Sequence, residues 1–172
     1  MKTKKVAFMG LFLALALVAG YVERLIPINL GVPGVKIGLA NIVTMVLLYC
    51  VGWKEAVWIS AARILLSGLL FGSGFAMVYS AAGAVFSILV MILLKKTKLF
   101  HSVGVSVMGG VFHNVGQILV AMVVLETKSL IYYLPILILS GLTAGIFVGL
   151  LSGWLTTRIH PVLKQEFGNI TK

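Results

Sequence analysis

Long apolar stretches separated by short basic breaks dominate this chain of 172 residues. Hydrophobic residues make up 60% of it and charged residues only 10%, and the mean hydropathy is +1.13. A soluble domain of this size cannot hide so much apolar surface from water. In lipid, only helices and closed barrels satisfy every backbone group, and about 20 apolar residues in a helix cross the hydrocarbon core. We therefore expect an all-α integral membrane protein, with residues 1–172 in one membrane domain.

The apolar stretches predict six transmembrane helices. The first stretch has a basic start and the length of a signal peptide, but five more follow it, so we interpret it as the first span with a basic anchor. Residues 158–172 are expected to form a short cytoplasmic tail. The six predicted spans are 6–22, 37–51, 55–71, 75–94, 103–125 and 131–157.

The basic residues predict the orientation. Of the 14 lysines and arginines, ten fall in one set of loops, three in the opposite set, and one, Arg63, inside a span. Because loops rich in lysine and arginine stay in the cytoplasm, we expect a multi-pass protein of the cell membrane with both termini cytoplasmic. The same distribution argues against nucleic-acid binding despite the net charge of +10, since the charges lie in loops rather than on one folded surface.

Arg63 is the most costly residue of the chain. An arginine at the centre of a span costs about 2.5–3.5 kcal/mol even on the lenient insertion scale, so it needs an anionic partner, a polar cage or water. The chain has no aspartate, and its four glutamates lie at or beyond the ends of the apolar segments. Arg63 therefore has no obvious carboxylate partner at its own depth.

Other polar residues are predicted at membrane depth. Helical spacing puts Ser67 on the same face as Arg63, and His113 on the same face as Gln117. Two interpretations remain open, a polar cavity between the helices or a structural network that fixes their packing. A cavity with excess positive charge suits an anionic or phosphate-bearing ligand that also has an apolar part. The candidate ligand-binding residues are Arg63, Ser67, Asn41, His113, Asn114, Gln117, and, from the rim, Lys36 and Glu23.

The loop before the short second span is unusual, because the sequence ERLIPINLGVPGVK, residues 23–36, is apolar yet rich in proline and glycine. It dips between helices or lies at the membrane interface, and both alternatives remain open. A broken segment beside a short span often marks a binding site in membrane proteins.

Small residues recur at intervals of four in two spans. Such steps let helix backbones approach closely. They serve packing within the chain or the docking of another membrane subunit. The residues of this predicted interface are Gly10 and Ala14 in the first span and Gly141, Gly145, Gly149 and Gly153 in the sixth.

Signatures of catalysis are lacking. His113 has no carboxylate to orient it as in a catalytic triad, and without aspartate the chain has little with which to hold Mg²⁺. The single cysteine, Cys50, excludes an internal disulfide and a multi-cysteine metal site. We expect neither enzyme activity of its own nor a cofactor or metal.

Four segments carry a resemblance: PGVKIGLANIVTM (33–45), ARILLSGLLFG (62–72), YSAAGAVFSILVMILL (79–94) and GGVFHNVGQILVA (109–121). In this order they resemble the Gx transporter family, which is also labelled heptaprenyl diphosphate synthase component I. The resemblance covers about residues 5–157. That family in turn is similar in architecture to the S-components of energy-coupling factor transporters, which are six-helix membrane proteins.

The resemblance implies two functions. In the first, which we favour from the sequence, the chain is a substrate-binding transport subunit. It captures a small anionic, partly apolar metabolite, flavin-like or prenyl-diphosphate-like, and works with a membrane coupling protein and its ATPases. In the second, it is a non-catalytic membrane subunit of a polyprenyl (heptaprenyl) diphosphate synthase, since such enzymes use aspartate-rich motifs that this chain lacks.

Overall fold

The computed structural model is all-helical, with six α-helices and one short 3₁₀-helix in the residues that it describes, 2–26 and 37–167. They are α1 (Lys2–Leu25), α2 (Leu39–Cys50), α3 (Trp53–Phe71), α4 (Gly74–Thr97), α5 (Ser102–Val124), η1 (Lys128–Tyr133) and α6 (Leu134–Phe167). All six predicted spans coincide with helices. Of the predicted loop 23–36, residues 23–25 belong to α1, and residues 27–36 lie outside the described residues.

Four helical segments are long and apolar enough to cross a membrane: Thr3–Leu25, Gly74–Thr97, Ser102–Val124 and Lys128–Gln165. The other two helices differ from these, because α2 has only 12 residues and α3 carries Lys54, Glu55 and Arg63 within 19 residues. Large apolar side chains cover the outside of the bundle, among them Trp58 on α3 and Val123 on α5. These features indicate a multi-pass membrane protein.

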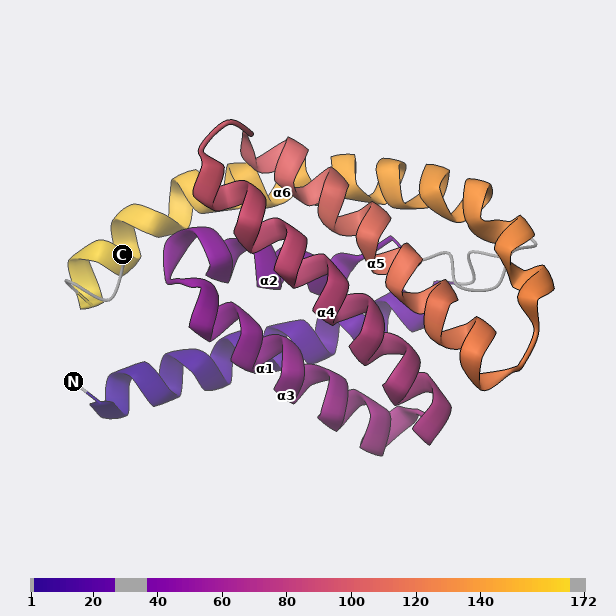
Figure 1. Ribbon diagram of the computed structural model, residues 1–172. Helices are drawn as coiled ribbons and strands as arrows, with labels where there is room; N and C mark the ends of the chain where they lie inside the picture. The colour runs from indigo at the N-terminus through magenta and orange to yellow at the C-terminus, as the bar shows by residue number, and fades with distance from the viewer. Residues whose placement is uncertain (1, 27–36, 168–172) are drawn as a thin grey trace.

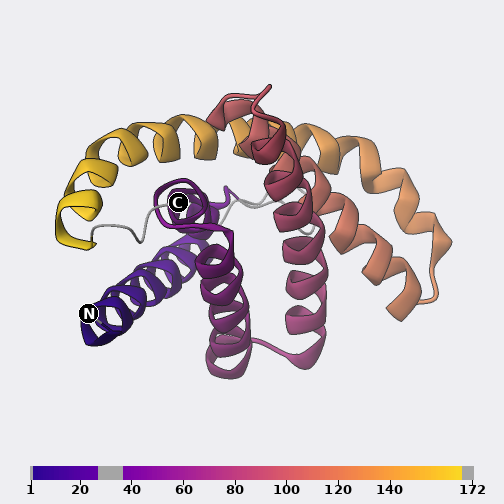
Figure 2. The same cartoon turned by 60° about the vertical axis from the view of Figure 1, so that its left-hand side comes forward.

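The helices form two groups around α2 (Figures 1 and 2). Helices α4, α5 and α6 pack tightly in chain order, whereas α1 and α3 pack more loosely beside α2. Figure 2 looks nearly along α2 and shows it in the middle of the molecule, with α1 and α3 below it and α6 arching over it. Eight of its 12 residues are buried, so this short helix forms the core.

Both ends of α2 are held by polar contacts. At its start, Gly38 has a φ of +84°, a conformation that glycine adopts without strain, and its N–H donates to Glu23 of α1 at 2.5 Å. At its end, the ammonium group of Lys95 of α4 donates to the carbonyl oxygen of Leu48 and lies 5.0 Å from the ring centre of Tyr49. These contacts fix where α2 lies along the bundle.

The C-terminal residues differ from the predicted tail. Helix α6 continues through Pro161 to Phe167, and Leu163 is buried in the core. A proline inside a helix removes one backbone hydrogen bond and bends the helix, and the last turns of α6 curve towards α1 (Figure 2). Residues 158–167 of the predicted tail therefore belong to α6, and Leu163 packs this part of the helix against the core. The start of α1 and the end of α6 lie at the same end of the bundle (Figure 1).

The glycine stripe of α6 packs inside the chain. A Cβ added at Gly141 would come within 2.8 Å of the carbonyl oxygen of Gly110, and one added at Gly145 within 2.5 Å of Cα of Val107. Gly149 and Gly153 likewise face Val103 and Ser102 of α5. Of the two alternatives, packing within the chain is confirmed, and the stripe is not available to another subunit because α5 occupies it.

Candidate functional site

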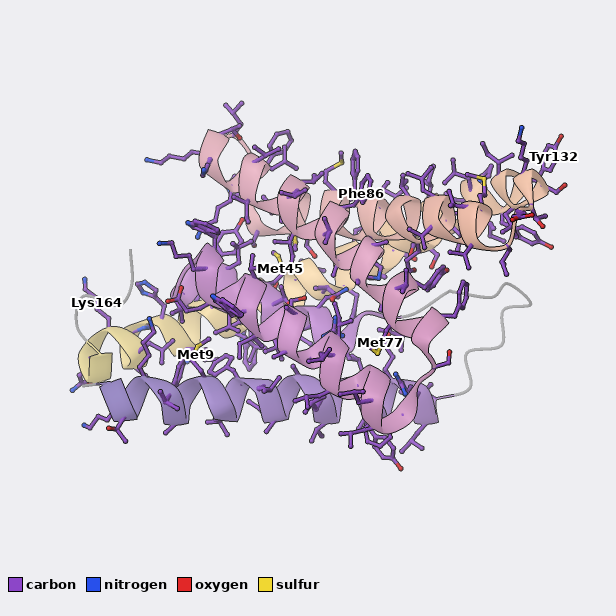
Figure 3. All side chains as sticks on the ribbon, turned by 60° about the horizontal axis from the view of Figure 1, so that its bottom comes forward. Met9, Met45, Met77, Phe86, Tyr132 and Lys164 are labelled. Carbon is purple, nitrogen blue, oxygen red and sulfur yellow. The ribbon has the colours of Figure 1, made fainter. Side chains whose placement is uncertain are left out.

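A polar cavity lies at the meeting point of all six α-helices, with a volume of about 80 Å³. Its walls include Glu23 of α1, Asn41 of α2 and Arg63 of α3. Helix α4 contributes Ser80 and Ser87, α5 contributes His113, Asn114 and Gln117, and α6 contributes the backbone around Gly141 and Gly145. Met45, in the interior in Figure 3, also lines it.

Six of the eight predicted ligand-binding residues line this cavity: Arg63, Asn41, His113, Asn114, Gln117 and Glu23. The other two are not placed there. Lys36 lies outside the described residues. Ser67 is a hydrogen-bond partner of Arg24, whose Nη2 donates to its Oγ at 3.0 Å, and it is not among the residues that line the cavity.

Two nitrogen donors of the cavity residues are buried without a hydrogen-bond partner in the described part of the chain. They are Nε of Arg63 and Nε2 of Gln117. A buried donor without an acceptor costs about 1–3 kcal/mol, and more when it is charged, so such groups in a native protein are usually paired with water or a ligand. Arg63 and Gln117 both line the cavity, and each carries a buried donor that the described part of the chain leaves unsatisfied.

Among the residues that the structure describes, the charged ones that line the cavity are Arg63 and Glu23, and Arg24 lies outside it. Glu23 attracts Arg63 electrostatically, whereas Arg24 repels it. The Glu23 carboxylate also accepts a hydrogen bond from the N–H of Gly38, so part of its capacity is used at the start of α2. The guanidinium group of Arg63 is therefore the cationic hydrogen-bond donor that the cavity offers, and such groups bind anionic acceptors more strongly than neutral ones.

The polar side chains of α5 that line the cavity contact different neighbouring helices. The side-chain amide of Asn114 donates to the carbonyl oxygen of Leu137 at 2.6 Å, which joins α5 to α6. His113 and Gln117 lie one turn apart and face Gly83 of α4, where an added Cβ would come within 2.9 Å of His113 Cε1 and 2.7 Å of Gln117 Cγ. Glycine at position 83 lets α4 approach α5 closely enough to close the cavity on this side.

Sequence reasoning missed Arg24. This residue in the last turn of α1 donates to the carbonyl oxygen of Phe71 at 3.0 Å, and its guanidinium lies 5.7 Å from the ring centre of Phe71. It thereby ties the ends of α1 and α3 together next to the cavity. A basic residue in the last turn of a helix is a recognisable signal for carbonyl capping, but it does not tell which helix supplies the carbonyl.

The cavity is small for a whole metabolite. About 80 Å³ holds a few water molecules or a small anionic group, whereas pockets that enclose drug-sized ligands measure roughly 300–1,000 Å³. A flavin ring system is larger than this volume. A phosphate or diphosphate group is of a suitable size and charge.

A family described as heptaprenyl diphosphate synthase component I matches residues 12–155 of the chain. The match covers α2 to α5, most of α1 and most of α6, and so includes every residue that lines the polar cavity. No curated protein and no solved structure gives a significant match.

Proposed function

The chain belongs to the heptaprenyl diphosphate synthase component I family, and on this premise we propose that it is a non-catalytic membrane subunit of a polyprenyl diphosphate synthase. In this role it binds the diphosphate group of an isoprenoid substrate or product in the polar cavity. The observation that carries the proposal is the pair of buried, unpartnered donors, Nε of Arg63 and Nε2 of Gln117. Among the ligand classes predicted from the sequence, a prenyl diphosphate fits the family and the cavity size better than a flavin.

A non-catalytic role follows from the residue types. Prenyl transfer requires metal-bound diphosphate, and oxygen ligands such as aspartate hold Mg²⁺. The chain contains no aspartate, and the described residues contain no group of three or more histidine, cysteine and acidic side chains that could hold a metal. The catalytic carboxylates must therefore come from a partner chain, and this protein contributes membrane attachment and a binding site.

A substitution at Arg63 tests the binding site. Charge-assisted hydrogen bonds contribute about 1.5–3 kcal/mol, so Arg63→Met should weaken the binding of farnesyl diphosphate about 10- to 100-fold. Arg158→Met, at an exposed position of α6, is the matched control and should bind like the parent. Affinities are measured in lipid nanodiscs with radiolabelled ligand. Equal affinity in Arg63→Met and the parent, with both folded, would refute the site.

A second candidate function is that of an S-component-like subunit of a transporter. A groove of about 550 Å³ on the outside of α1 and α3 favours it, because a coupling protein would need such a surface. The predicted interface residue Gly10 lines this groove, and a Cβ added there meets nothing within 4 Å. Ala14 is also exposed on α1. These two residues remain a proposed interface for a partner helix.

Purification with native partners separates the two functions. A synthase subunit should co-purify with a soluble, aspartate-rich chain and raise its prenyl transfer activity. A transport subunit should co-purify instead with a membrane coupling protein and two ATPases. Recovery of the second set without the first would replace the proposed function by the transport function.

A further inference from the structure

An apolar groove of about 580 Å³ runs between α3 and α4 on the outside of the bundle. Ala61, Ile64 and Leu65 line it from α3, and Ala81, Ala84 and Ile88 from α4. Near the hairpin that joins the two helices, α3 and α4 are in close contact, since a Cβ at Gly68 would overlap with Met77. Met77 is labelled between the two helices in Figure 3.

The groove and the polar cavity share the same two helices. On α3, Arg63 lines the cavity and its neighbour Ile64 lines the groove. On α4, Ser80 and Ser87 line the cavity, and the next residues, Ala81 and Ile88, line the groove. The floor of the groove includes the buried small side chains of Ser60 and Ala84. Helices α3 and α4 therefore carry Arg63 and the serines of the polar cavity on one side and the apolar groove on the adjoining side.

We propose that the α3–α4 groove binds the hydrocarbon chain of an isoprenoid diphosphate whose diphosphate group occupies the polar cavity at Arg63. The inference rests on the proposed function. It further specifies that the hydrocarbon chain of the ligand lies in the groove and that the ligand enters from the side, out of the bilayer. Size and charge select this occupant. The cavity of about 80 Å³ holds only the charged group, so the chain must lie outside it, and the groove is the apolar space next to Arg63.

Photocrosslinking tests the position of the chain directly. The probe is a farnesyl diphosphate analogue with a diazirine at the end of its chain, added to the full-length protein in nanodiscs. Labelled peptides should come from residues 57–65 of α3 and 77–92 of α4, and an excess of inorganic diphosphate should prevent the labelling. Labels confined to α1 or α6 would overturn the proposal. Labelling that persists when inorganic diphosphate is bound to the protein would also overturn the proposal. The hydrocarbon chain of the probe would then bind independently of its diphosphate group.

Filling the groove supplies a second measurement. Ala61→Phe places a ring in the groove from an exposed position and should weaken farnesyl diphosphate binding by about tenfold or more through lost apolar contacts. Binding of inorganic diphosphate should not change. Ala7→Phe, at an exposed position of α1 away from the groove, is the matched control. If Ala61→Phe weakens both ligands equally or neither, the groove does not hold the chain.

The outcomes also distinguish this proposal from the function on which it rests. If inorganic diphosphate binds in an Arg63-dependent manner but the chain crosslinks elsewhere, the proposed function stands and the groove assignment fails. If neither diphosphate binds the parent protein, both fail. If dioleoyl phosphatidic acid displaces the probe more strongly than farnesyl diphosphate does, the groove is a site for ordinary anionic lipid and the isoprenoid assignment is overturned.

Discussion

Replacing Gly145 by alanine should push α5 and α6 apart and destabilise the fold. The new Cβ would lie 2.5 Å from Cα of Val107 and 2.9 Å from the carbonyl oxygen of Ser106, whereas carbon atoms normally pack at about 3.5–4.0 Å. Both neighbours are backbone atoms, so no side-chain rotation relieves the clash. The two helices must separate by about 1 Å, which also loosens the contacts of Gly141 and Gly149 on the same face.

Gly10 provides the matched control. Alanine is favoured over glycine inside a helix by about 1 kcal/mol, and at Gly10 this gain is unopposed because nothing lies within 4 Å of the added Cβ. The same gain applies at Gly145, so the difference between the two variants isolates the steric cost. Overpacking typically costs about 1–3 kcal/mol. We expect Gly145→Ala to be less stable than Gly10→Ala by this amount.

The single cysteine makes the measurement simple. Cys50 is buried in α2, with 1% of its surface exposed, so a thiol-reactive fluorescent dye reports unfolding as the protein is heated in nanodiscs. A change of 1 kcal/mol shifts Tm by about 2–4 °C for a chain of this length. Equal Tm values for the two alanine variants would refute the close approach of α5 and α6 that the structure shows.

Two further predictions concern the cavity. Gly83→Ala should weaken diphosphate binding, because its Cβ would meet the carbonyl oxygen of His113 at 2.9 Å and displace α5 where it lines the cavity. Gly74→Ala is the control, because nothing lies within 4 Å of its added Cβ. Equal diphosphate affinities in the two variants would contradict the prediction. Asn114→Leu should lower the free energy of unfolding by about 0.5–1.5 kcal/mol, because it removes a hydrogen bond that joins α5 to α6 while the carbonyl oxygen of Leu137 keeps its bond within α6. An unchanged Tm in the dye assay would show that the hydrogen bond from Asn114 is dispensable.

Hydropathy predicted the helices well because lipid leaves the backbone few alternatives. An apolar run must satisfy its own hydrogen bonds, so its length and its bounding glycines and charges place a helix within a few residues. The end of α6 escaped this reasoning. Residues 158–167 are less apolar than a span, and their helix depends on the contact of Leu163 with the core, which only the tertiary structure shows.

The polar cavity was predictable for a related reason. A polar side chain at membrane depth is costly, so the sequence predicted that Arg63, His113 and Gln117 share either a polar cavity or a packing network. All three line one cavity. Helical spacing could not exclude Ser67, because the partner that engages it, Arg24, comes from another helix. Nor could it show that α5 occupies the glycine stripe of α6. Both facts depend on which helices are neighbours.

The short central helix has a consequence for how the protein is made. Twelve residues of α-helix extend about 18 Å, which is too short to cross about 30 Å of hydrocarbon. Helix α2 is therefore not stable as an independent span when it leaves the translocation machinery. It requires the partners that hold its two ends, Glu23 of α1 and Lys95 of α4. We therefore expect α2 to settle at its final depth only after α4 has been synthesised, so that a later segment of the chain stabilises an earlier one.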